Sequence, residues 1–195
     1  MNPSHYLTFL RILLSPVFPV LYLEREKLGV SLVLLPYIML FLLFICECSD
    51  VLDGMLARRR NEVTDLGKVL DPMADSITHI SLFLTFTQGV VALPLILVFI
   101  FLYRDMLITT LRTLCALRGV ALAARFSGKM KAVLQAIVIF FILLLMIPYS
   151  KGWITLALFQ QMSLFAVSVA AFYTVVSIVD YIYANWAHIK RVSTK

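Results

Sequence analysis

Residues 50–75 read DVLDGMLARRRNEVTDLGKVLDPMAD, and the rest of the chain is best interpreted from this stretch. Asp50 and Asp53 are three residues apart, and Asp71 and Asp75 are four apart. Both spacings place two carboxylates on one face of an α-helix. Because only a short basic segment separates the pairs, two helices joined by a turn can bring all four carboxylates together.

The sequence around this stretch is too apolar for a soluble domain. Of its 195 residues, 62% are hydrophobic and 14% are charged, and the mean hydropathy is +0.95. Such values are typical of helical membrane proteins. Six segments are long and apolar enough, or nearly so, to cross a bilayer, and they cover residues 6–23, 30–47, 73–87, 91–114, 132–147 and 162–184. The sequence therefore predicts an all-α integral membrane protein, a six-transmembrane-helix bundle forming a single domain over residues 1–195.

Prolines mark two of the predicted helices. Pro16 and Pro19 lie within the first and are expected to bend it, because proline lacks the amide hydrogen that an α-helix uses. Pro148 is expected to end the fifth.

Charged residues indicate how the bundle sits in the membrane. The 17 basic residues outnumber the 11 acidic ones, and most of them gather in or around the second and fourth connections and in the C-terminal tail. The positive-inside rule places these regions in the cytoplasm. We therefore expect both termini, and a site built on the aspartates, to face the cytoplasm from the inner (cytoplasmic) membrane. The basic excess then reflects topology and anionic lipid headgroups rather than a nucleic-acid partner.

The four aspartates are predicted to bind divalent metal. Four carboxylates converging at a membrane boundary repel one another unless cations lie between them. Carboxylate oxygens are hard ligands that suit Mg²⁺ or Mn²⁺, and two metals bridged by carboxylates are a known arrangement for displacement at phosphorus. His79 is expected to pack or hydrogen-bond rather than bind metal, and Glu47 to support the site from behind.

Small and basic residues between the aspartates complete the predicted site. Gly54 and Ala57 follow Asp53 and remove bulk beside it, so a nucleotide or a neighbouring backbone can approach closely. Gly67 does the same at the entry to the third predicted helix. Arg58 is suited to pairing with a phosphate or an aspartate.

The complete pattern resembles the signature of the CDP-alcohol phosphatidyltransferase family, D-x-x-D-G-x-x-A-R-x8-G-x-x-x-D-x-x-x-D. The sequence matches every fixed position of this signature, namely Asp50, Asp53, Gly54, Ala57, Arg58, Gly67, Asp71 and Asp75. The six-helix fold of that family also agrees with the six predicted segments.

The resemblance implies a reaction and a set of roles. CDP-diacylglycerol is the donor, an alcohol is the acceptor and CMP leaves. Asp75 is implied as the general base as well as a metal ligand, and the four aspartates as holding Mg²⁺ or Mn²⁺, with two ions expected. Asp50, Gly54, Ala57, Arg58 and Gly67 are implied to form the nucleotide pocket. Family members are commonly homodimers.

Basic residues further along the chain are predicted to select the acceptor. A cluster of cations beside an acidic site favours an anionic acceptor such as glycerol 3-phosphate. The candidates are Arg104, Arg112, Arg118, Lys129 and Lys131. Arg104 and its neighbour Asp105 are expected to point in different directions, while Arg104 and Arg112 can face one cavity.

The order of these residues resembles the bacterial branch of the family that uses glycerol 3-phosphate. Ser76 departs from that branch, which typically carries Lys after the last aspartate. Inositol or an inositol phosphate is therefore the alternative acceptor. From a different class of protein, the alternative is a divalent-cation transporter that uses the same carboxylates, although no internal repeat supports it.

Overall fold

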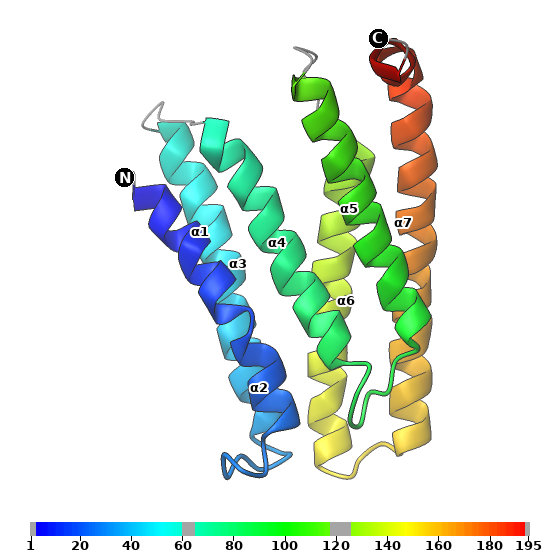
Figure 1. The fold of residues 1–195 in the computed structure, drawn as a ribbon. Helices are drawn as coiled ribbons and strands as arrows, with labels where there is room; N and C mark the ends of the chain where they lie inside the picture. Colours follow the sequence, from blue (N-terminus) through cyan, green and yellow to red (C-terminus); the bar gives the residue numbers. More distant parts are fainter. Residues whose placement is uncertain (1–2, 60–64, 118–125, 194–195) are drawn as a thin grey trace.

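The computed structural model describes residues 3–59, 65–117 and 126–193, and all regular structure in these ranges is helical. The helices run roughly side by side (Figure 1). Both chain ends lie at one end of the bundle, while the connections 24–34, 86–94 and 151–155 lie at the other. The helices are α1 (Pro3–Leu14), α2 (Val17–Leu23), α3 (Leu35–Arg59), α4 (Asp65–Thr85), α5 (Leu95–Leu117), α6 (Phe126–Ser150) and α7 (Leu156–Ser193).

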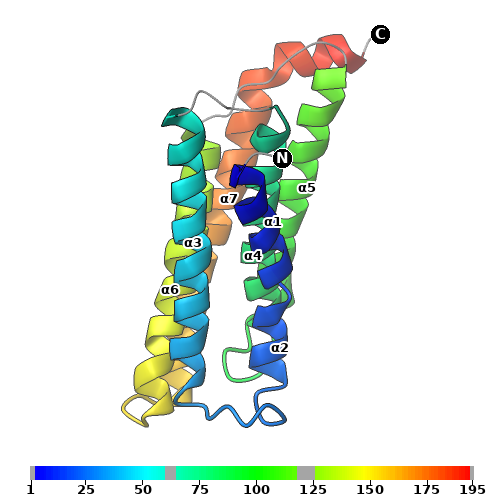
Figure 2. The ribbon, with the colours of Figure 1, turned by 90° about the vertical axis from the view of Figure 1, so that its left-hand side faces the viewer.

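The first predicted helix is interrupted where the prolines indicated a bend. α1 ends at Leu14 and α2 begins at Val17, with Pro16 between them. Ser15 closes α1, because both its backbone N–H and its hydroxyl donate to the carbonyl of Arg11. The two helices continue one after the other along the bundle (Figure 2).

The remaining helix limits differ from the predicted ones for local reasons. α3 begins at Leu35 rather than residue 30, and the Ser31 hydroxyl accepts the N–H of Leu34 just before it. α5 begins after Pro94, which disfavours helix in the residue before it. α6 continues two residues past Pro148. α6 and α7 are longer than predicted. Polar residues extend the start of α6 and the end of α7, and α7 also begins earlier, with the apolar residues 156–159.

Two helices are long and apolar enough to span a membrane within the described residues, Phe126–Ser150 and Leu156–Trp186. Shorter apolar stretches cover Thr8–Leu23 and Leu35–Ser49. Large apolar side chains also face outward, and Phe165 and Phe172 are 73% and 74% exposed. A soluble protein rarely leaves so much apolar surface uncovered, so the structure is that of a helical membrane protein.

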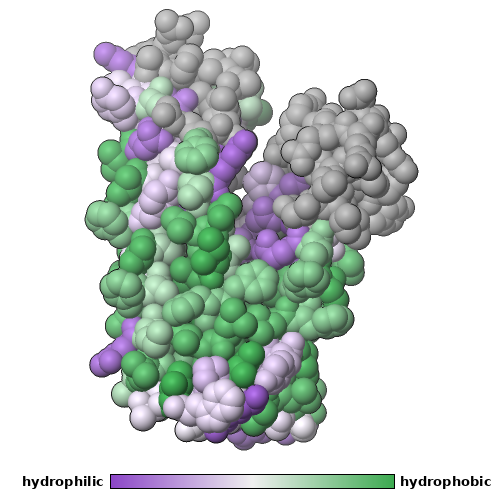
Figure 3. Space-filling model, turned by 180° about the vertical axis from the view of Figure 1, so that it is seen from behind, coloured by the Kyte–Doolittle hydropathy of each residue, from purple (hydrophilic) through white to green (hydrophobic). Residues whose placement is uncertain are grey.

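The core is formed by residues of all the helices from α2 to α7. Leu43, Leu82, Ile139 and Ile142 are fully buried there, and the rings of Phe83 and Phe101 pack with their centroids 4.7 Å apart. Polar residues gather instead in a hollow near the end that carries the termini, above a broad apolar band (Figure 3). On this face, polar residues therefore gather toward one end of the bundle.

At the other end, Gly89 is expected to be intolerant of substitution. Its φ is +65°, and a Cβ there would lie 2.8 Å from a ring carbon of the buried Tyr22. Gly29 has a similar φ of +68° but nothing within 4 Å. We expect Gly89→Ala to destabilise the protein by about 3 kcal/mol, from backbone strain plus overpacking.

The control Gly29→Ala should cost only about 1 kcal/mol of backbone strain. Thermal unfolding in detergent compares the two variants. Equal losses in both would show that the contact with Tyr22 does not matter.

Candidate active site

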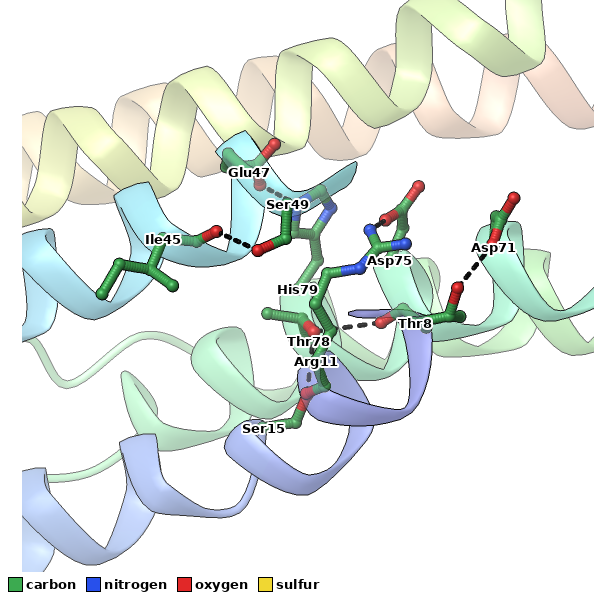
Figure 4. Close-up of polar contacts among 11 residues, drawn as sticks. Thr8, Arg11, Ser15, Ile45, Glu47, Ser49, Asp71, Asp75, Thr78 and His79 are labelled. Atoms are coloured by element: carbon green, nitrogen blue, oxygen red, sulfur yellow. Dashed lines mark hydrogen bonds and ion pairs between the residues drawn. The ribbon is translucent and has the colours of Figure 1, made fainter. Parts of the chain in front are cut away.

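Two of the predicted metal ligands lie on one side of α4. Asp71 and Asp75 extend from the helix one turn apart, next to residues of α1 (Figure 4). Asp75 keeps 34% of its side chain exposed, so it remains accessible to a ligand. The prediction that this pair shares a helix face is confirmed.

The other motif residues lie on α3 and α4, but their side chains are outside the part of the chain that the structure describes. Asp50, Asp53, Gly54, Ala57 and Arg58 lie in the C-terminal half of α3, and Gly67 lies in the first turn of α4. Arg118 follows α5, outside the described residues. Their predicted roles therefore stay predictions.

Helix α1 contributes contacts that the sequence interpretation missed. Thr8 donates from its hydroxyl to Oδ1 of Asp71 at 2.9 Å, and Arg11 forms a salt bridge with Asp75 through Nη1. One turn further along, the hydroxyls of Ser15 and Thr78 are 2.8 Å apart. The sequence did contain a signal for these contacts, since three polar residues at helical spacing in an apolar segment form one edge of a helix.

Behind the aspartates, a contact joins α3 to α4. His79, one turn after Asp75, lies 3.2 Å from Oε1 of Glu47 through its Nε2 atom. His79 is 5% exposed, which confirms a packed, hydrogen-bonded histidine. Because Glu47 precedes Asp50 by one turn, this contact links the two helices that carry the motif.

The donor set fits a hard divalent cation. Asp71 and Asp75 offer carboxylate oxygens one helical turn apart, and the nearby His79 already contacts Glu47. Hard oxygen ligands of this kind suit Mg²⁺ or Mn²⁺. Among the described side chains, no group of three His, Cys, Asp or Glu residues converges.

A buried cluster of opposite charges joins α5 and α6. Nζ of Lys131 lies 2.8 Å from both carboxylate oxygens of Asp105, and Nη1 of Arg104 lies 3.0 Å from Oδ1. Asp105 and Lys131 are 7% and 3% exposed. The Ser76 side chain also interacts with Asp105, which connects this cluster to the residue directly after Asp75.

This cluster corrects one prediction. Arg104 and Asp105 were expected to point in different directions, but they interact directly. The spacing argument considered only where each side chain leaves the helix, whereas the long arginine side chain curves back to its neighbour. Gly128 of α6 leaves room for it, because a Cβ there would lie 3.1 Å from Nη2 of Arg104.

The other predicted acceptor residues lie apart from this cluster. Nε of Arg112 donates to the Tyr181 hydroxyl at 3.3 Å, and its guanidinium lies over the Tyr181 ring, 5.6 Å from the centroid. Lys129 is exposed. The structure thus brings Arg104 and Lys131 together on Asp105, and holds Arg112 against α7.

Comparison with known proteins identifies the family. The family model of CDP-alcohol phosphatidyltransferases matches residues 1–175. The chain is 32% identical to a CDP-diacylglycerol--glycerol-3-phosphate 3-phosphatidyltransferase of Bacillus subtilis, over 97% of both chains. It is 31% identical to the proteins of the same name from Rickettsia typhi, over 77% of this chain and 79% of the relative, and from Treponema pallidum, over 77% and 72%. With its paired aspartates and helical membrane fold, the chain belongs to the CDP-alcohol phosphatidyltransferase family.

Proposed function

We propose that this protein transfers a phosphatidyl group from CDP-diacylglycerol to sn-glycerol 3-phosphate, giving phosphatidylglycerophosphate and CMP. The observation that carries this proposal is the similarity along 97% of the chain to a relative named for this reaction. The pair Asp71 and Asp75, at the polar end of the bundle, provides the acidic centre that the reaction needs.

In the proposed mechanism, Asp50, Asp53, Asp71 and Asp75 hold the divalent cations, two Mg²⁺ or Mn²⁺. When bound, these cations neutralise charge on the phosphates and on the leaving group. Asp50 with Gly54, Ala57, Arg58 and Gly67 shapes the pocket for the cytidine nucleotide.

Asp75 is the proposed base. One of its carboxylate oxygens takes the proton from the acceptor hydroxyl, whose oxygen attacks the lipid-side phosphorus. The bond from this phosphorus to the oxygen of the CMP phosphate breaks, and that oxygen leaves with CMP. The exposure of Asp75 leaves room for an acceptor hydroxyl within hydrogen-bond reach, which such proton transfer requires.

We propose that the basic residues contribute to acceptor binding in two ways. Arg112, Arg118 and Lys129 supply charge to the phosphate directly. Lys131 and Arg104 face Asp105, so much of their charge is already neutralised. Their contribution is then to shape the acceptor side of the site.

The proposed topology has six membrane crossings, with both termini and the active site in the cytoplasm. It is supported by the two chain ends lying at the same end of the bundle, and by the basic residues at that end. The inner (cytoplasmic) membrane and a homodimer complete the proposal.

An acceptor panel tests this function. Purified protein in mixed micelles with CDP-diacylglycerol and Mg²⁺ is given glycerol 3-phosphate, inositol, inositol 1-phosphate or serine, and CMP release is measured. We expect release with glycerol 3-phosphate alone. Equal or faster release with inositol or inositol 1-phosphate would assign the protein to another acceptor.

Arg112→Ala is expected to affect the acceptor more than the donor. Loss of one charge-assisted contact to a phosphate should raise the KM for glycerol 3-phosphate about tenfold or more. The KM for CDP-diacylglycerol should stay near that of the wild type. Steady-state kinetics with each substrate varied in turn measures both.

Arg25→Ala is the matched control for this variant. Arg25 pairs with Glu26 at the opposite end of the bundle, and neither KM should change. An equal rise in both KM values for Arg112→Ala would contradict a role in binding the acceptor phosphate.

A further inference from the structure

We propose that Arg11 is a positioning residue of the reaction. Its guanidinium holds the Asp75 carboxylate from the buried side, so that the negative charge of Asp75 interacts with both the guanidinium and a bound metal. This inference rests on the proposed function, because it gives a role to a residue that contacts the proposed base. It makes α1 a working part of the catalytic centre.

The contact belongs to a continuous polar edge of α1. Thr8 and Arg11, in a helix that is otherwise mainly apolar, are 1% and 3% exposed, and Ser15, directly after its end, is 0% exposed. Each meets one polar residue of α4, in the order Asp71, Asp75 and Thr78 (Figure 4). The edge therefore aligns the two helices at three successive positions.

The backbone that carries Arg11 is itself held in place. The Ser15 hydroxyl contacts the Arg11 carbonyl at 2.8 Å and the Thr78 hydroxyl at 2.8 Å. The Thr78 hydroxyl oxygen also lies 3.0 Å from the carbonyl oxygen of Ala74, the residue before Asp75, and the two hydroxyl hydrogens are shared among these three contacts. The arginine and the aspartate are thus both anchored by the same short network.

The uneven burial of the pair argues for more than helix packing. A buried arginine needs a counter-charge, and a buried carboxylate would satisfy it. In this salt bridge, Asp75 instead keeps 34% exposure against 3% for Arg11. The guanidinium contacts Oδ1 of Asp75 through Nη1 from the buried side, and a charge-assisted hydrogen bond of this kind favours one direction of the carboxylate, so it orients Asp75 while leaving it accessible to ligands.

A fixed positive charge beside Asp75 also opposes a divalent cation at the same carboxylate. Removing the charge should therefore tighten metal binding, while the loss of orientation slows the reaction. Damage to the fold would weaken metal binding and lower the reaction rate together. This opposite response distinguishes positioning from a merely structural role.

The experiment compares Arg11→Met with the wild type in lipid nanodiscs. Mn²⁺ binding is followed by electron paramagnetic resonance without substrates, and kcat and KM are measured separately. We expect Arg11→Met to bind Mn²⁺ about tenfold more tightly, to lose about 100-fold in kcat, and to change the KM for CDP-diacylglycerol little. The matched control Arg25→Met makes the same change at the opposite end of the bundle, where Arg25 pairs with Glu26, and it should keep the wild-type Mn²⁺ affinity.

Arg11→Lys provides a second readout should Arg11→Met fail to fold. It keeps the charge and loses the planar fork, so it should bind Mn²⁺ like the wild type with kcat lowered about tenfold. Weaker Mn²⁺ binding in step with lost activity, or wild-type kcat in both variants, would overturn the proposal. Wild-type protein that is inactive with every acceptor would instead refute the proposed function, and the Mn²⁺ comparison would still decide the effect of Arg11 on the metal.

Discussion

Asp75→Asn is expected to lower kcat about 1,000-fold, the scale of effect for removing a positioned general base. Asparagine has nearly the same size, and its side-chain oxygen can still accept the hydrogen bond from Arg11. The amide, however, cannot take the proton of the acceptor hydroxyl. We therefore expect the variant to fold and to bind CDP-diacylglycerol, but not to turn it over at a useful rate.

Two measurements check this result. CMP release gives the rate, and equilibrium binding of labelled CDP-diacylglycerol reports on the donor site. Glu24→Gln, which removes a carboxylate at the opposite end of the bundle, should match the wild type in both. Full turnover by Asp75→Asn would remove Asp75 from the role of base.

The second large effect is expected on stability. In the wild type, Nζ of the buried Lys131 contacts both carboxylate oxygens of Asp105. Asp105→Asn leaves this cation with a neutral partner. Breaking a buried ion pair from one side typically costs about 3–5 kcal/mol. We expect Asp105→Asn to lose stability on this scale in unfolding by SDS or heat.

A double variant separates this effect from loss of shape. In Asp105→Asn combined with Lys131→Met, the uncompensated charge of Lys131 is gone, while Arg104 keeps its charge and can still donate to the asparagine oxygen. Most of the lost stability should return. Glu26→Gln, a carboxylate in an exposed pair, should cost less than about 1 kcal/mol. A double variant no more stable than Asp105→Asn would show that the charge of Lys131 was not the cause.

The helices could be predicted from the sequence because their apolar segments are long and continuous. The limits were harder to predict, since an apolar segment shows only the part of a helix that avoids water. Phe126 to Met130 of α6 and the residues after Trp186 of α7 are helical although they lie at or beyond the edge of the apolar part. The break at Pro16 was predictable from the chemistry of proline alone.

The aspartate pair of α4 was also predictable, because its spacing is a property of one helix. The contacts of Thr8 and Arg11 with that pair join residues more than sixty positions apart, and they depend on how α1 packs against α4. The interaction of Arg104 with Asp105 shows a different limit of prediction from the sequence. Helical geometry was known there, but the reach of one flexible side chain decided the outcome.

The measurement that tests the central claim most directly is product formation by metal-depleted protein. The protein is stripped with EDTA, given CDP-diacylglycerol and glycerol 3-phosphate, and assayed by mass spectrometry before and after Mg²⁺ is restored. We predict equal amounts of CMP and phosphatidylglycerophosphate after Mg²⁺ addition and neither product before it. Transport of Mg²⁺ into liposomes by protein that releases no CMP would contradict the assignment as a phosphatidyltransferase.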